Sequence, residues 1–113
     1  MTSSILYMTF DCADPELLAG FWGAALGYER MDTGDGNVAI TPQDGSGVPI
    51  WFIVVPEPKT AKNRFHLDLQ CDNMDAEVAR LVVLGATVLW VHNGVRQSWT
   101  TLADPEGNEF CVG

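Results

Sequence analysis

The amino-acid sequence predicts an α+β fold built from two tandem modules, each with the element order β-α-β-β-β. Two observations support this prediction: a strand followed by a helix occurs twice, and each occurrence precedes three strand-like runs separated by turn residues. The chain has 113 residues and is 47% hydrophobic, which is enough for a single packed core. We therefore predict one domain over residues 1–113, with a first module at about 3–55 and a second at about 64–113.

The first module opens with a predicted strand at Ile5–Phe10. A helix start follows at Asp14, Pro15 and Glu16, which supply an N-cap, a proline at the first helical position and an early acid. Gly27 can close this helix in a left-handed conformation. Apolar residues recur at helical spacing along one expected face, which comprises Leu17, Leu18, Phe21, Trp22 and Ala25.

The same pattern returns in the second half, with a predicted strand at Phe65–Leu69 and capping candidates at Asp72–Asn73. Gly85 is the expected end of the second helix. Aligning the two copies sets Tyr7 over His66. The expected apolar face of the second helix comprises Val78, Leu81 and Val82.

Six further strands complete the two modules, with turn-forming residues at 32–37, 43–47 and 104–108. The segment Pro56–Asn63 is the expected connection between the modules. The predicted strands are Tyr28–Met31, Val38–Thr41, Ile50–Val55, Thr87–Val91, Ser98–Leu102 and Glu109–Val112.

The composition argues against two classes of partner. A formal net charge of -9 repels phosphate backbones and anionic membrane surfaces, so we expect no nucleic-acid and no membrane partner. No basic hydrophobic leader and no long apolar span are found, and three cysteines without a CxxC pair suit a reducing compartment. We therefore expect a cytoplasmic protein in which Cys12, Cys71 and Cys111 are buried free thiols.

Three stretches carry a more specific signal: Phe10–Pro15 leading to Phe21–Trp22, then Lys59–Leu69, and finally Leu102–Cys111. Together they resemble the glyoxalase-like domains of the vicinal oxygen chelate superfamily, which includes glyoxalase, bleomycin resistance protein and dioxygenase. The resemblance implies the glyoxalase/bleomycin resistance/dihydroxybiphenyl dioxygenase-like fold, in which the paired modules curl a mixed sheet around a cup. It also implies a small-molecule ligand or substrate in that cup and a homodimer.

In this superfamily the first and last strands of each module supply metal ligands, and His66 and Glu109 match the two positions in the second module. Strand alternation sets Asp68 and Gln70 on the same face as His66. In the first module Tyr7 matches His66, and the last-strand position falls among residues 49–51, none of which coordinates a metal. The resemblance therefore implies an incomplete metal site at His66 and Glu109, with no certain cofactor and at most a weakly bound divalent metal.

The functional hypothesis is a protein that binds a small organic molecule, with a lyase- or isomerase-type step through an enolate-like intermediate as one version. In that version Glu109 is the general base and His66 its partner or a metal ligand. Classical glyoxalase I activity is not expected because ligands are missing. The predicted ligand-binding residues are Tyr7, Asp68, Gln70, Trp51 and Trp99.

Each assignment has an alternative. His66 can simply be hydrogen-bonded to a neighbouring group, Glu109 can be a half-buried structural carboxylate, and strand tryptophans fill cores as readily as pockets. The basic residues Lys59, Lys62 and Arg64 form either a solvated linker or an anion-binding rim. At the level of the whole protein, a non-catalytic binder similar to bleomycin-resistance proteins competes with the enzyme, and a purely structural module is a third class.

Overall fold

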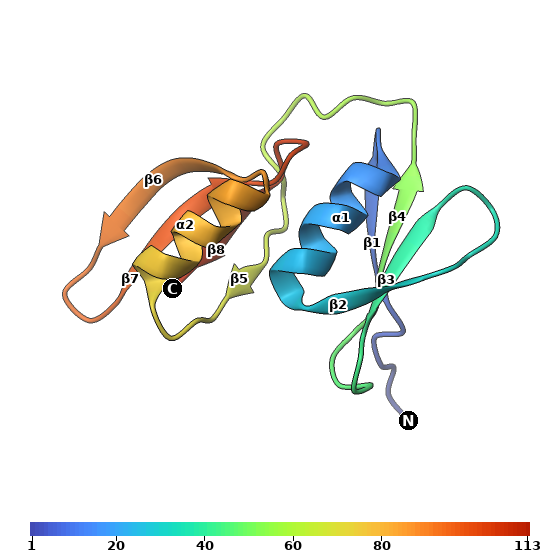
Figure 1. Ribbon diagram of the computed structural model, residues 1–113, viewed down its shortest axis with the longest axis horizontal. Helices are drawn as coiled ribbons and strands as arrows, with labels where there is room; N and C mark the ends of the chain where they lie inside the picture. Colours follow the sequence, from blue (N-terminus) through green and yellow to red (C-terminus); the bar gives the residue numbers. More distant parts are fainter. The chain divides into compact units, whose positions relative to one another are not determined.

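The computed structural model describes residues 1–113 and has the duplicated element order that the sequence predicts. The chain divides into two units, Met1–Pro58 and Lys59–Gly113, each with one helix and one four-stranded mixed sheet (Figure 1). The predicted α+β fold of two βαβββ modules is confirmed. Neither sheet closes into a barrel.

The first unit has the sheet order β1-β4-β3-β2. β1 runs parallel to β4, whereas the β2–β3 and β3–β4 pairs are antiparallel. Its elements are β1 (Met8–Cys12), α1 (Pro15–Leu26), β2 (Tyr28–Met31), β3 (Val38–Pro42) and β4 (Ile50–Val54).

The first strand lies further along the chain than the prediction of Ile5–Phe10. Its pairing with β4 runs from Met8 opposite Ile50 to Cys12 opposite Val54, so residues before Met8 have no backbone partner in the ladder. Ile5 and Leu6 are correspondingly exposed. The apolar residues of the sequence predict that a strand is present here, but pairing with β4 determines the residue at which it begins.

Helix α1 begins and ends where local chemistry predicts. The Asp14 carboxylate accepts a hydrogen bond from the Leu17 backbone N–H at 3.1 Å, and Gly27 adopts φ 69° after the last helical residue. Leu18, Phe21 and Trp22 are buried, but Leu17 is 47% exposed, so its place on the apolar face was predicted wrongly. At about 100° per residue the buried arc centres between Leu18 and Trp22, and Leu17 falls beyond its edge.

The second unit repeats the arrangement with the sheet order β5-β8-β7-β6. β5 is parallel to β8, and the β6–β7 and β7–β8 pairs are antiparallel. Its elements are β5 (Asp68–Leu69), α2 (Met74–Leu84), β6 (Thr87–Asn93), β7 (Ser98–Ala103) and β8 (Glu109–Val112).

Strand β5 is much shorter than the predicted Phe65–Leu69. The reason lies in the side chain of Asn63, which donates to the backbone oxygen of Glu109 at 3.2 Å and accepts from its N–H at 2.9 Å. A side chain thus takes the place of backbone at the start of the β5–β8 ladder. Backbone pairing begins only with the Cys111 N–H donating to the Leu67 oxygen at 2.9 Å.

Helix α2 is capped as predicted, with the Asn73 side chain accepting from the Ala76 N–H at 3.0 Å and Gly85 following the last residue. It packs against β6, β7 and β8. Leu81 is fully buried, whereas Val82 is 44% exposed and does not belong to the packed face as predicted. One face of the second sheet is therefore covered by α2, and the buried residues of this unit include Leu81, Leu102, Phe110 and Val112.

All three cysteines are free, as predicted, but only Cys12 is buried. Cys71 and Cys111 are half-buried. For Cys111 the reason is that its face of β8 is not the one packed against α2, whereas Cys71 follows the end of β5. Neither helix is long and apolar enough to cross a membrane.

Candidate functional site

The second sheet has one face packed against α2, and its opposite face carries a row of functional side chains. Asp68 pairs with Cys111 across the parallel β5–β8 ladder, Cys111 pairs with Thr101, and Thr101 pairs with Trp90. Residues that pair directly project from the same face of a sheet. Phe110 and Val112, which flank Cys111 in β8, point the other way and are buried.

Around this row lies an open cavity with a volume of about 660 Å³. Two indole rings belong to it, of which Trp90 is half-exposed and Trp99 stacks on His92 with ring centroids 3.8 Å apart. The lining combines these aromatic rings with acids, amides, hydroxyls, a lysine, a histidine and a thiol. The residues are Lys62, His66, Asp68, Leu69, Gln70, Trp90, Gln97, Ser98, Trp99, Thr101, Glu109, Cys111 and Gly113.

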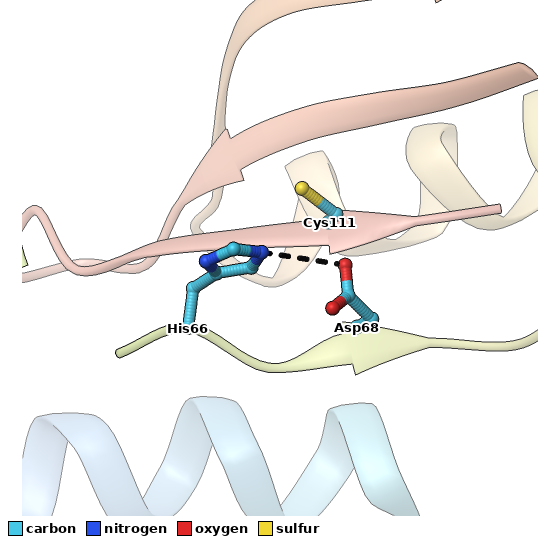
Figure 2. Close-up of side chains that lie close together, drawn as sticks. All are labelled: His66, Asp68 and Cys111. Carbon is cyan, nitrogen blue, oxygen red and sulfur yellow. Dashed lines mark ion pairs between the residues drawn. The ribbon is translucent and has the colours of Figure 1, made fainter. Parts of the chain in front are cut away.

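Three potential metal ligands gather at one place in the cavity: His66, Asp68 and Cys111 (Figure 2). Their donor atoms all lie within 4.8 Å of one another, and the imidazole Nε2 of His66 is 3.5 Å from a carboxylate oxygen of Asp68. Asp68 opens β5, His66 lies two residues before it, and Cys111 comes from the adjacent β8. The hydroxyl of Thr101 lies 3.3 Å from the Cys111 sulfur, which places a hydrogen bond on the thiol.

Glu109 occupies a different part of the same cavity. Its carboxylate is ion-paired with the Lys62 ammonium, and only 17% of the Glu109 side chain is exposed, compared with 70% for Lys62. The Lys62 nitrogen also lies over the Trp90 ring, 5.6 Å from its centroid. The Asn63 side chain binds the Glu109 backbone twice: its amide nitrogen donates to the Glu109 carbonyl oxygen, and its amide oxygen accepts from the Glu109 N–H. Glu109 is thus held by an ion pair at its side chain and by two hydrogen bonds at its main chain.

The structure brings most of the sequence-predicted site residues together. His66, Asp68, Gln70, Trp99 and Glu109 all line this cavity. The other two ligand-binding candidates belong to the first unit, where Tyr7 and Trp51 have ring centroids 5.3 Å apart. Their approach to His66 stays a prediction.

Sequence reasoning missed Asn63 and Thr101. The partners of the Asn63 side chain include Glu109, 46 residues away, and no local pattern indicates that contact. Thr101 was recoverable, because it lies two residues from Trp99 on the same face of β7.

The turn before β8 depends on the aspartate, glycine and asparagine of the stretch at 104–109. The Asp104 carboxylate, in a residue only 3% exposed, accepts hydrogen bonds from the backbone N–H groups of Glu106 at 2.9 Å and Asn108 at 3.0 Å. The Asn108 side-chain amide donates to the same carboxylate at 2.9 Å, and Gly107 adopts φ 87°. This closed turn sets the start of β8 and so the position of Glu109.

The family model of the glyoxalase-like domain matches residues 7–113. The chain belongs to this family. No curated protein matches the sequence.

Solved structures with the same fold include members of the glyoxalase/bleomycin resistance/dioxygenase family. An enzyme of that family from Burkholderia phytofirmans PsJN is 17% identical with a TM-score of 0.79, over 97% of each chain. A variant of the fosfomycin resistance protein FosX from Listeria monocytogenes, complexed with Mn(II) and dihydroxypropylphosphonic acid, is 15% identical with a TM-score of 0.79. That match covers 99% of this chain and 90% of the FosX chain.

A third similar structure is TnmS3, an antibiotic-binding protein from Streptomyces sp. CB03234. It is 21% identical with a TM-score of 0.71, over 99% of this chain and 95% of TnmS3. At these identities the three likenesses establish the fold. They include proteins described as an enzyme and as a binder, so the fold alone does not decide between these two classes.

Proposed function

We propose that this glyoxalase-like protein binds a small organic molecule in the cavity of its second module. The observation that carries the proposal is the convergence of two indole rings, those of the exposed Trp90 and the half-buried Trp99, with a few polar groups on one open sheet face. Ligand pockets of this kind combine aromatic walls with a small number of placed polar groups. A purely structural module would fill such a face with its own side chains, whereas this cavity measures about 660 Å³.

The side chains suggest how a ligand is held. Trp90 and Trp99 offer flat apolar surface, and Gln70 and Asp68 offer amide and carboxylate groups at the β5 side. Lys62 is mostly exposed, so its ammonium can leave Glu109 and pair with an anionic group of the ligand. We therefore favour a ligand with a planar or apolar part and one acidic or carbonyl-bearing part.

Two observations support a catalytic version of this proposal. Glu109 is largely shielded from water yet faces the cavity, and a movement of Lys62 frees its carboxylate oxygen to accept a proton. His66 lies in the same cavity and is the second candidate for moving a proton. In this version Glu109 removes a proton from a carbon next to a carbonyl group, which is the start of a lyase or isomerase reaction.

The binding proposal is tested by calorimetry with three named probes: fosfomycin, bleomycin and the glutathione hemithioacetal of methylglyoxal. For any probe that binds, Trp99→Ala should weaken binding by about 1–3 kcal/mol, the loss of a buried aromatic contact. Val83→Ala, on the exposed side of α2, is the control and should leave affinity unchanged. Equal effects of both variants would contradict a ligand site on this face.

Catalysis is separated from sequestration by Glu109→Gln. In an enzyme, this variant should retain probe binding but lose conversion and the exchange of a carbon-bound hydrogen for solvent deuterium, followed by NMR. In a non-catalytic binder, wild type and variant give no exchange at equal affinity. Trp51→Ala and Tyr7→Ala test separately whether these two first-module residues contribute to affinity.

The assembly and the environment of the protein are part of the same proposal. We expect a homodimer with two-fold symmetry, as is common for closed assemblies of identical chains. Light scattering across micromolar concentrations measures this, and a monomer throughout would rule it out. The excess of acidic residues and the free thiols fit a cytoplasmic protein without nucleic-acid or membrane partners.

A further inference from the structure

We infer that His66, Asp68 and Cys111 form a binding site for a thiophilic divalent cation of the zinc type, in which Cys111 rather than Glu109 completes the ligand set. This inference concerns the metal alone and needs no organic ligand. It differs from the pair His66 and Glu109 that the sequence resemblance implied.

The geometry of the three donors is close to that of a metal site. Zinc binds imidazole nitrogen and carboxylate oxygen at about 2.0–2.1 Å and thiolate sulfur at about 2.3 Å, so tetrahedral ligands lie about 3.3–3.5 Å apart. The His66 nitrogen and the Asp68 oxygen are already 3.5 Å apart. All three donor atoms lie within 4.8 Å of one another, so side-chain rotation has to shorten any donor–donor distance by at most about 1.5 Å to reach that tetrahedral spacing.

The backbone holds these donors in register. Asp68 and Cys111 are direct partners in the parallel ladder, so their side chains project from the same face of the sheet. Figure 2 shows His66 and Asp68 extending from their segment toward β8, the strand that carries Cys111. The backbone hydrogen bonds on either side of this pair, from Cys111 to Leu67 and from Gly113 to Leu69, fix the strand spacing. The Thr101 hydroxyl hydrogen-bonds the Cys111 sulfur and orients it, which is the usual task of a group next to a metal ligand.

Glu109 is a poorer ligand than its position in the sequence suggests. Its carboxylate is already neutralised by Lys62, and a cation at Glu109 has to displace an ammonium that also contacts the Trp90 ring. By contrast, the ion-pair partner of Asp68 is His66, itself a proposed ligand, and the Asp68 side chain is 74% exposed. Entry of a cation at His66, Asp68 and Cys111 therefore breaks no lysine ion pair.

The donor set selects the type of metal. The similar FosX structure contains Mn(II), a hard cation that prefers oxygen ligands. Here one of the donors is a thiol, which releases its proton on binding and favours zinc, cobalt or cadmium over manganese and magnesium. Three protein ligands leave one tetrahedral position open toward the cavity, as in zinc sites that also bind a small molecule.

The test uses the full chain titrated with Co²⁺, a spectroscopic substitute for zinc, and with Zn²⁺ and Mn²⁺ by calorimetry. Wild type should show the near-ultraviolet charge-transfer band of a cobalt–thiolate bond and should bind zinc at least about tenfold more tightly than manganese. Cys111→Ser should abolish the band, and Cys111→Ser and His66→Ala should each weaken zinc binding by about tenfold or more.

Matched controls come from the same unit. Cys71→Ser removes the other half-exposed thiol and should retain the band and the affinity, and Glu109→Gln should change zinc affinity by less than about threefold. Bound zinc should also slow iodoacetamide alkylation of Cys111 but not of Cys71. Circular dichroism checks that each variant is folded.

Three outcomes overturn the inference: a cobalt band that survives Cys111→Ser, zinc binding that Glu109→Gln abolishes while Cys111→Ser does not, or no saturable zinc binding to the wild type. None of these outcomes bears on binding of the organic probes. The metal site and the proposed small-molecule function can therefore fail independently.

Discussion

The side chain of Asn63 determines how β8 starts, and Asn63→Ala tests this directly. The amide of Asn63 makes three hydrogen bonds: 2.9 Å from the Glu109 N–H, 3.2 Å to the Glu109 oxygen and 2.6 Å to the Phe65 oxygen. The two bonds to Glu109 are part-buried, and a net contribution of about 1 kcal/mol for each predicts a destabilisation of about 2 kcal/mol. The bond to Phe65 is exposed, so water replaces it at little cost.

Two measurements follow this change. Urea unfolding should show the loss of about 2 kcal/mol, and the midpoint of thermal unfolding should fall by roughly 8 °C for a chain of this size. Hydrogen exchange at the Glu109 amide should accelerate by about thirtyfold, the same free energy expressed as an opening equilibrium.

Asn63→Asp is the sharper variant. It keeps an acceptor for the Glu109 N–H but turns an oxygen toward the carbonyls of Phe65 and Glu109, where the amide donated. We expect it to be at least as destabilising as the alanine variant at neutral pH. Asn93→Ala, at the exposed end of β6, is the control. A loss below about 0.5 kcal/mol in Asn63→Ala, within the range of ordinary surface substitutions, would refute this account of β5 and β8.

Three other predictions concern the turn, the core and a surface ion pair. Asp104→Ala should destabilise the chain by about 3 kcal/mol in urea unfolding, because two backbone N–H groups lose a charged acceptor; an effect below about 1 kcal/mol would mean that water replaces it. Leu18→Ala should cost about 3 kcal/mol and Leu17→Ala less than about 1 kcal/mol, since only Leu18 is fully buried; equal losses would contradict the packing of α1. The hydrogen bond from Arg30 lowers the pKa of Glu16 below its ordinary 4.5, so this pair stabilises the fold above that pH and the contribution disappears as pH falls through the lowered pKa. An NMR titration should show the Glu16 pKa rising in Arg30→Ala, and an unchanged titration would exclude the pair in solution.

The predictions that succeeded rest on local chemistry. Asp14 and Gly27 mark the ends of α1 because capping involves groups within one turn of the helix. The alternation of Glu109 and Cys111 with buried Phe110 follows from the two-residue period of any strand. Such features depend on neighbours in the sequence, and a single chain contains that information.

The predictions that failed depend on distant partners. Leu17 has the right spacing for the apolar face, but the position of the sheet under α1 decides the edge of the buried arc. Cys111 was expected to be buried as an apolar residue of β8, yet its face of the sheet is the open one. The local pattern shows that two faces differ, but not what covers each of them.

By itself the sequence determined the duplicated βαβββ order, the helix ends and the face of β8 on which Glu109 and Cys111 lie, because periodicity and capping are local properties. Only the tertiary structure decided which side chains meet on that face. The parallel register sets Cys111 beside Asp68, and Lys62 pairs with Glu109 across 47 residues of sequence. Contacts between segments so far apart are chosen by strand register and chain path, which no window of the sequence specifies.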